Sequence, residues 1–352
     1  MSTQTAIMSN DVSASPYVVI VVLNWNNSED TITALGSIQR MDYPHSAVLI
    51  IDNGSTDGSV QKLREMVSAG VELIELPENS GYTGGCNVGM RRALEMGAQY
   101  IWLLNNDSVV PRHALRSMVS VAESDPKIGL VAPMIASLGD APHMTYAGGV
   151  VYVEVRRYDE TNDPDEAIVW EKRYPGKELA LGTAMLVRSS LIREIGFLDE
   201  RFFAYYEDID YSARSIAAGY RNVVDRAVVI QHFEKNRDIT PLEMKPHYWY
   251  YMARNESRFW RKHVGFVRSL RPTAGAFLRY IRNLNACKAK PASTQAILAG
   301  LWHGWWDRGG PYEPSYRMPG LIQALVWAVA SRPKYQVTHK DVVRIPVRQT
   351  AD

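Results

Sequence analysis

Short apolar runs that stop at polar residues dominate the first third of the chain. Four of them occupy residues 17–23, 48–51, 71–76 and 100–104. Each run is continuous and rich in Val, Ile or Leu, which is typical of strands buried on both faces of a sheet. Helical spacing of apolar residues fills the intervals at about 28–40, 58–69 and 86–97. This alternation predicts βαβ units in an α/β fold, with a mostly parallel twisted sheet flanked by helices.

The pattern is less regular after residue 107. We expect a helix at about 111–123, a strand at 128–133, a hairpin or loop insert at 144–175, a strand at 179–188, helices at 189–195 and 207–218, and a strand at 223–232. From Pro246 onward the sequence is helical, aromatic and basic. The predicted organisation is a disordered leader (1–15), an α/β domain (16–235) and a helical C-terminal appendage (236–352).

Bulk composition describes an ordinary globular protein. Of 352 residues, 46% are hydrophobic and 22% are charged, and the formal net charge of +1 argues against nucleic acid as a partner. Cys86 and Cys287 form no CxxC motif, so neither a disulfide framework nor a cysteine-rich zinc site is expected. The polar first 15 residues do not resemble a signal peptide, and no run approaches the roughly 18 apolar residues of a membrane span.

Amide and carboxylate side chains follow the predicted strands where each one ends. Right-handed crossovers place these ends at one edge of the sheet, so Asn24, Asp52 and Asp107 should lie close together. Asp52 could accept a hydrogen bond from the imide N–H of uracil or thymine, or could form a tight turn before the next helix. Asp107 could hold a metal-bound phosphate, or could belong to an ordinary Asn/Asp turn.

A glycine-rich segment, residues 79–87, comes just before a predicted helix. Glycines let the backbone approach a phosphate or sugar closely, and a helix N-terminus favours anions. The segment reads GxxGG rather than GxGxxG. A Rossmann dinucleotide site is therefore disfavoured, and a plain glycine turn stays open as the alternative.

Six motifs occur in order along the α/β domain. They are NWNN (24–27), IDNGSTDGS (51–59), NSGYTGGCNVG (79–89), LLNNDS (103–108), GTAMLVR (182–188) and GFLDERFFAYYEDIDYSAR (196–214). In this set the chain resembles glycosyltransferase family 2, and most closely its bacterial rhamnosyltransferase-like group. The resemblance covers residues 17–235, with a weaker extension at 299–311. It implies a GT-A fold and inverting transfer of a sugar from a nucleotide diphosphate donor.

Carried over residue by residue, the resemblance also implies roles within the site. Asp208 matches the general base, and Asp107 matches the last residue of the family's DxD motif, which binds Mg²⁺ or Mn²⁺ bridging the diphosphate. His232 matches a diphosphate or metal contact of some members. The implied donor-binding residues are Asn24, Asp52, Gly84, Gly85, Asn87, Asn105 and Asn106, and the acceptor-side residues are Gly182, Thr183 and Glu207. Asn105 stands where many relatives carry a second acid, so metal affinity is the property that the resemblance supports least.

The chemistry of these residues agrees with the implied roles. Inversion needs one carboxylate to deprotonate the acceptor hydroxyl, and a divalent cation to offset charge on the leaving diphosphate. Asp208 lies at a predicted helix start, which favours its ionised form, whereas the like charges of Glu207 and Asp210 raise its proton affinity. Without the other motifs, this acidic run would read as the charged first turn of a solvated helix.

The C-terminal segment 247–260, HYWYYMARNESRFW, combines aromatic and basic residues. One interpretation is a membrane-surface helix that brings an enzyme to a polyprenyl-linked acceptor. The other is packing of the aromatic rings against the α/β domain, with the arginines in solvent. Tryptophans at 302, 305 and 306 favour an interface. The expected location is cytoplasmic, either free or peripheral on the inner face of the cell membrane.

The sequence thus predicts an inverting, metal-dependent glycosyltransferase. The preferred assignment is transfer of L-rhamnose from dTDP-rhamnose to a hydroxyl of a cell-surface glycan or lipid-linked acceptor. A UDP-hexose donor is the nearest alternative. A catalytically silent sugar-nucleotide-binding protein is another, kept open by Asn105, and a nucleotidyltransferase is disfavoured because no Gly-rich, Lys/Arg-bearing loop follows the first strand.

Overall fold

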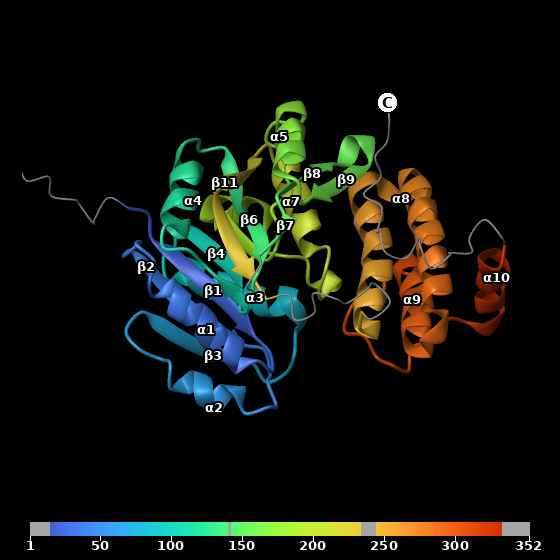
Figure 1. Cartoon of the computed structure of the whole chain (residues 1–352). Coiled ribbons are helices and arrows are strands. Elements are labelled where there is room, and N and C mark those ends of the chain that lie inside the picture. Colours follow the sequence, from blue (N-terminus) through green and yellow to red (C-terminus); the bar gives the residue numbers. More distant parts are fainter. Residues whose placement is uncertain (1–14, 140–141, 234–243, 333–352) are drawn as a thin grey trace, which may run out of the picture.

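The computed structural model describes residues 15–139, 142–233 and 244–332. A nine-stranded mixed sheet with helices on both faces forms the α/β part, and a group of helices lies to one side of it (Figure 1). The strands are β1 (Val18–Asn24), β2 (Ser46–Asp52), β3 (Val71–Glu75), β4 (Tyr100–Asn105), β5 (Ser108–Val109), β6 (Ile128–Ser137), β7 (Met144–Tyr146), β10 (Ala184–Arg188) and β11 (Arg221–His232). The predicted leader lies outside the described residues except for Ser15.

The strand order is β3-β2-β1-β4-β10-β6-β11-β5, with β7 paired to β6. Strands β3, β2, β1 and β4 are mutually parallel, whereas β10 runs antiparallel between β4 and β6. A separate hairpin joins β8 (Gly148–Tyr152) to β9 (Arg157–Thr161). The predicted α/β class with a mostly parallel sheet is therefore confirmed.

Burial on both faces explains why the first strands read as unbroken apolar runs. In β1, Val18, Ile20 and Val22 point into one hydrophobic cluster, and Val19 and Val21 into the other. The first cluster packs against α1 (Ser28–Ile38) and α4 (Ala114–Glu123), and the second against α3 (Gly81–Glu95), α6 (Ser189–Ile195) and α7 (Glu207–Ala217). The sheet is thus a central layer whose strand ends stay open at its edges.

Helix α3 begins five residues earlier than the pattern predicts. Its glycines lie inside the helix because they face the sheet at close range: a Cβ on Gly85 would meet Leu23 Cδ1 at 2.3 Å, and one on Gly89 would meet Val21 Cγ1 at 2.4 Å. The segment is therefore the first part of a helix rather than a glycine turn.

The remaining elements follow the prediction, with α2 and β10 shorter than expected and β6 and β11 longer. Helix α2 spans Ser59–Arg64, α5 spans Pro164–Arg173, and the predicted 144–175 insert contains β7, the β8–β9 hairpin and α5. The strand expected from residue 179 starts only at Ala184, since the Gly182 amide is bonded to Asp208 instead of to a neighbouring strand.

The C-terminal helices are α8 (Pro246–Ala286), α9 (Pro291–Trp305) and α10 (Gly320–Ala330). Helix α8 is broken at Gly265, whose φ of 75° and ψ of 168° are not helical. In every helix of the described ranges, length or polarity rules out passage across a lipid bilayer. The domain boundary predicted at 235/236 falls outside the described residues.

Aromatic side chains of the first half of α8 face inward. Tyr250, Phe259 and Trp260 are buried, and the last two share a hydrophobic cluster with Phe202 and Tyr206 of the α/β part. This agrees with the packing interpretation of segment 247–260.

The expectation of solvated arginines in that segment is wrong for Arg254 and Arg258, which are 0% and 2% exposed. Both side chains turn inward and donate to backbone carbonyls of the segment before α7. Arg254 Nη2 donates to the Phe202 carbonyl at 2.7 Å, and Arg258 Nη1 donates to the Arg201 carbonyl. Arg254 also donates to the Gly310 carbonyl at 2.6 Å, so it joins α8 to two distant segments.

These carbonyls belong to an unusual stretch that leads into α7. After the short 3-10 helix η3 (Glu200–Phe202), three non-glycine residues adopt positive φ: Phe203 (65°), Tyr205 (65°) and Tyr206 (73°). Such conformations cost about 1–3 kcal/mol each. The Asn255 amide offsets this cost by donating to the carbonyls of Phe202, Ala204 and Tyr205 at 3.0, 2.8 and 2.8 Å.

We therefore expect Asn255→Leu to destabilise the protein by on the order of 3 kcal/mol, because the Ala204 and Tyr205 carbonyls lose the Asn255 donor and the Phe202 carbonyl loses one of its donors. Thermal unfolding followed by circular dichroism measures this effect. Asn285→Leu is the matched control: it gains the same helix propensity, and its amide donates to the Ala330 carbonyl at 2.9 Å rather than to the segment before α7. Equal losses of stability in the two variants would contradict the account.

Candidate functional site

Asn24 and Asp52 end adjacent parallel strands and lie directly opposite each other in the register. Asn24 Nδ2 donates to Asp52 Oδ2 at 2.7 Å, and the Ser55 amide donates to Asp52 Oδ1 at 2.9 Å. Both side chains are fully buried. The second bond closes the tight turn that the sequence offered as an alternative, and each carboxylate oxygen still has a lone pair for a further donor. The nucleobase role of the pair stays a prediction.

Thr31, on α1, was not singled out from the sequence. Its hydroxyl donates to Asn24 Oδ1 at 2.8 Å, and Asn106 Nδ2 donates to Thr31 Oγ1 at 2.9 Å. A continuous chain of hydrogen bonds thus runs from Asp52 through Asn24 and Thr31 to Asn106. The signal in the sequence is weak, since a threonine on a helix face is common.

Asp107 and His232 meet at the other side of the same edge. Strand β5 pairs with β11, so Ser108 lies opposite His232. The side chain of Asp107, the residue before Ser108, therefore lies beside the His232 ring. His232 Nε2 lies 2.9 Å from Asp107 Oδ1 and 3.4 Å from Asn105 Nδ2. Both the histidine and the aspartate are about one quarter exposed, at 25% and 24%. Asn105, Asp107 and His232, distant in sequence, therefore form one partly accessible polar group.

Asp208 lies at the start of α7, beside Gly182. The Gly182 amide donates to Asp208 Oδ2 at 3.0 Å, and the Ile209 amide donates to Oδ1 at 2.8 Å. The Thr183 carbonyl in turn accepts from the backbone N–H of Asn105 at 2.9 Å. The Gly182–Thr183 segment thus ties Asp208 to the end of β4, where Asn105 and Asp107 lie.

Burial raises the pKa of Asp208, and the two amide donors offset part of this rise. Burial, and next the Asp208 charge, raises the pKa of Glu207 to about 8. Glu207 Oε2 is buried with no hydrogen-bond partner among the described residues. Near neutral pH, the pair therefore holds an ionisable Asp208 beside a largely protonated Glu207.

The third acid of this run behaves differently. Asp210 is fully buried, and its carboxylate contacts Lys262, His263 and Arg214 at 2.8 to 2.9 Å. Burial alone would raise the pKa of Asp210, but these partners hold it below its usual value. Asp210 is thus an anchor between α7 and α8.

Three of the predicted donor-binding residues lie in the interior of α3. Gly84 and Gly85 are buried against Ser80 and Leu23. Asn87 donates to the Leu198 carbonyl and to Glu200 Oε1, both at 2.9 Å, and accepts from the Leu198 amide at 3.0 Å. The structure thus brings Asn87 together with segment 198–200, whereas Gly85 faces Leu23 and Asn53, the residues next to Asn24 and Asp52.

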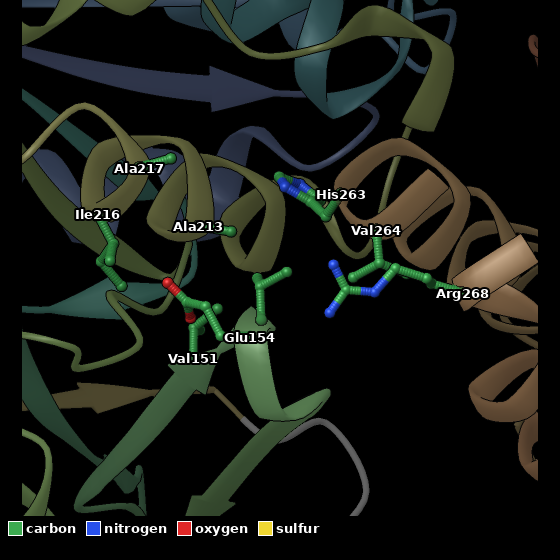
Figure 2. Close-up of a pocket in the computed structure, with 9 residues that line it drawn as sticks. Val151, Glu154, Ala213, Ile216, Ala217, His263, Val264 and Arg268 are labelled. Atoms are coloured by element: carbon green, nitrogen blue, oxygen red, sulfur yellow. The ribbon is translucent and has the colours of Figure 1, made fainter. Parts of the chain in front are cut away.

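A hollow of about 230 Å³ lies at the junction of β8, α7 and α8 (Figure 2). Its lining is mainly aliphatic, with Glu154, His263 and Arg268 at the margin (Figure 2). None of the predicted site residues lines it, so it is distinct from the polar edge described above. Across residues 15–139, 142–233 and 244–332, no three His, Cys, Asp or Glu side chains gather as a ready-made metal cluster.

Comparison with known proteins identifies the family and the fold. Residues 18–196 match the family model described as glycosyl transferase family 2. Among curated relatives, a low-salt glycan biosynthesis hexosyltransferase of Haloferax volcanii is 26% identical over 58% of this chain and 65% of its own length. An N-acetylglucosaminyl-diphospho-decaprenol L-rhamnosyltransferase of Mycobacterium tuberculosis is 25% identical over 61% of this chain and 77% of its own. The chain thus spans slightly less than two thirds of the first relative.

A solved mannosyltransferase of Pyrobaculum calidifontis, in complex with GDP-mannose and Mn²⁺, covers 93% of this chain and 84% of its own with a TM-score of 0.53 and 18% identity. A second structure, GalNAc-T7 with UDP, GalNAc and Mn²⁺, covers 62% of this chain and 44% of its own with a TM-score of 0.52 and 16% identity. These two structures bear on the fold alone, and they confirm the predicted GT-A architecture. Because the family model matches half of its residues, the chain belongs to glycosyl transferase family 2.

Proposed function

We propose that this chain is an inverting glycosyltransferase that moves a sugar from a nucleotide diphosphate donor to a hydroxyl acceptor in glycan biosynthesis. One observation carries the proposal. The backbone bonds of Gly182 and Thr183 link Asp208 to the strand end that bears Asn105 and Asp107, and the Asp52–Asn24 pair lies on the neighbouring strands of that edge. A carboxylate for proton transfer, a polar group for a diphosphate and a polar group for a nucleobase are thus arranged along one edge.

For the donor, dTDP-L-rhamnose is the preferred assignment. Asp52 suits the imide N–H of thymine, and the mycobacterial relative is an L-rhamnosyltransferase. Uracil carries the same imide, so a UDP-hexose remains the alternative donor. A glycan or polyprenyl-linked hydroxyl is the proposed acceptor, since the same relative is described by a diphospho-decaprenol substrate.

Asp107 and His232 fit a Mg²⁺ or Mn²⁺ ion. Their facing atoms lie 2.9 Å apart. Neighbouring ligands of an octahedral cation with bonds of about 2.1 Å lie roughly 3.0 Å apart. Because no third acid or histidine joins the pair in the described part of the chain, diphosphate oxygens would complete the ligand set. Bound there, the cation would offset negative charge on the leaving diphosphate.

Asp208 is the proposed general base. The acceptor oxygen forms a bond to the anomeric carbon, the bond from that carbon to the diphosphate oxygen breaks, and the hydroxyl proton passes to the Asp208 carboxylate. Two backbone amides hold this carboxylate in place, and its raised pKa makes it a stronger base than a free aspartate. Since only the ionised form accepts a proton, activity should increase as pH rises through this pKa.

Asp208→Asn tests the base directly. We expect kcat to fall about 10³-fold, the usual contribution of a positioned base, while the Kd of the donor changes by less than about threefold. Nucleotide release and isothermal titration measure the two quantities. Asp165→Asn, at an exposed acid on α5, is the matched control. Near-normal turnover by Asp208→Asn would exclude Asp208 as the base. Loss of turnover in both variants would show that the effect is not specific to Asp208.

The metal assignment predicts that Asp107→Asn and His232→Gln each raise the Mn²⁺ concentration for half-maximal activity by at least about tenfold. Activity measured across a metal titration after chelation gives this value. His113→Gln, which removes a ring that contacts the Ala227 carbonyl, is the control and should leave the midpoint unchanged. A metal midpoint that is the same in all four proteins would contradict the assignment.

The Glu207 side chain predicts a pH-dependent stability difference. Its pKa rises from 4.5 to about 8 on folding, so its stabilising contribution is complete below pH 4.5 and is lost as pH rises through 8. Glu207→Gln has no such loss. Its melting temperature relative to wild type should therefore increase between pH 5 and pH 9, by on the order of 5 °C. The exposed Glu65→Gln is the control, and a pH-independent difference for Glu207→Gln would contradict the buried, protonated state.

A further inference from the structure

A second hollow, of about 310 Å³, opens where η3, α8 and the chain after α9 meet. Its lining consists of Arg201, Arg258, Arg261, Lys262, Phe266 and Asp307. None of these residues belongs to the predicted site. We call this hollow the cationic pocket; its volume is near the lower limit for small-ligand sites.

Positive charge exceeds negative charge in the cationic pocket. The acids that neutralise its four cations are Asp307, Asp199 and Asp210. Asp210 is also bonded to Arg214 at 2.9 Å, so part of its charge is already used by a fifth cation. Clustered cations with too few carboxylates repel one another, and an added anion relieves that repulsion.

Arg258 carries a buried donor without an acceptor. Its side chain is 1% exposed, its Nε donates to Asp307 Oδ1 at 2.7 Å, and its Nη1 donates to the Arg201 carbonyl. Its Nη2 is buried and has no hydrogen-bond partner among the described residues. A buried guanidinium nitrogen without a partner is costly, and an anion oxygen in the pocket would satisfy it.

Arg261 is the second donor available to a ligand. Its Nη1 donates to the Trp305 carbonyl, and no carboxylate within the described ranges pairs with it. It lies at the opening, half-buried, with its guanidinium 5.7 Å from the ring of Phe266. Planar guanidinium groups match phosphate oxygens in geometry, so two arginines that face one hollow suit a phosphate better than a halide or a single carboxylate.

The cationic pocket has an apolar, exposed rim, by which we mean Phe266 of its lining, Trp305 in contact with that ring, and their chain neighbours Val267 and Trp306. Phe266, Val267, Trp305 and Trp306 are 54%, 76%, 42% and 63% exposed, and the Phe266 and Trp305 rings lie 5.9 Å apart. Exposed tryptophans next to arginines are typical of surfaces at the headgroup level of a bilayer. An exposed apolar rim of this kind favours the phosphate of a membrane lipid as the ligand over the phosphate of a freely soluble compound.

We propose that the cationic pocket binds the phosphate of an anionic membrane lipid, through Arg258 Nη2 and Arg261, while Phe266, Trp305 and Trp306 insert between the headgroups. The α8–α9 side of the molecule then faces the membrane. This inference concerns membrane attachment and does not depend on the assigned donor, metal or base.

Co-sedimentation of the full chain with vesicles tests the proposal. Wild type should bind phosphatidylglycerol vesicles at least tenfold more tightly than phosphatidylcholine vesicles, and Arg261→Gln should weaken this binding about fivefold or more. Arg268→Gln is the matched control, because this exposed arginine lies seven residues further along α8 and does not line the cationic pocket. It should weaken binding less than twofold.

A second measurement uses only the wild-type chain, so it does not depend on how a variant folds. Phenylglyoxal should modify Arg261, as mapped by mass spectrometry, and pyrophosphate in EDTA should slow this reaction at Arg261 but not at Arg268. Chelation suppresses metal-bridged binding at the Asp107 edge.

If Arg261→Gln and Arg268→Gln weaken vesicle binding equally, the attraction is a diffuse charge effect and the cationic pocket is not the binding site. Protection of Arg261 by pyrophosphate, with vesicle binding unchanged in Arg261→Gln, would overturn the lipid as the source of the phosphate. Absence of both vesicle binding and protection would overturn the whole proposal.

Discussion

The hydrogen bonds of the Asn255 amide are the contacts on which the proposed catalytic arrangement depends. This amide donates to the carbonyls of residues 202, 204 and 205, in a stretch where three side chains sit on left-handed backbone. That stretch ends at Glu207 and Asp208. Without these bonds, its strain would favour a relaxed loop, and the acids would lose their position relative to Gly182.

The C-terminal helices therefore help to hold the proposed site residues in position. Arg254 adds a bond to the Phe202 carbonyl, and Arg258 donates to the neighbouring Arg201 carbonyl. Lys262 and His263 bind Asp210 on α7. One face of α8 thus holds both the approach to the proposed base and the helix that bears it. Arg258 and Lys262 of this face also line the cationic pocket, together with Phe266 just beyond the Gly265 break.

Much of this fold follows from local physics that the sequence displays. Strands buried on both faces must be continuously apolar, so β1, β2 and β4 could be predicted within a few residues, and their polar ends marked Asn24, Asp52 and Asp107. The sequence pattern places the start of α3 five residues too far along the chain, because its glycines resemble a turn. In the structure these glycines allow the helix to contact Leu23 and Val21 closely. Thr31 gave no distinct signal, because its partners are brought to it only by the assembled sheet edge.

The inward arginines were missed for a related reason. Arg254 and Arg258 donate to the carbonyls of Phe202 and Arg201, which lie more than 50 residues earlier in the chain at the end of the short helix η3. Composition alone describes such a segment as a basic, exposed helix. In the folded protein, buried backbone carbonyls need hydrogen-bond donors, and these two arginines supply them. This part of the helix is therefore buried rather than exposed.

A screen of sugar nucleotides with anomeric analysis tests the central claim most directly. The purified chain would be incubated with dTDP-, UDP- and GDP-sugars, an acceptor lipid diphosphate sugar and Mn²⁺ or Mg²⁺, and products would be assigned by NMR. The account predicts release of one nucleoside diphosphate, and a product whose new linkage has the opposite anomeric configuration to the donor. Donor binding without any transfer, or a product that retains the configuration, would contradict it.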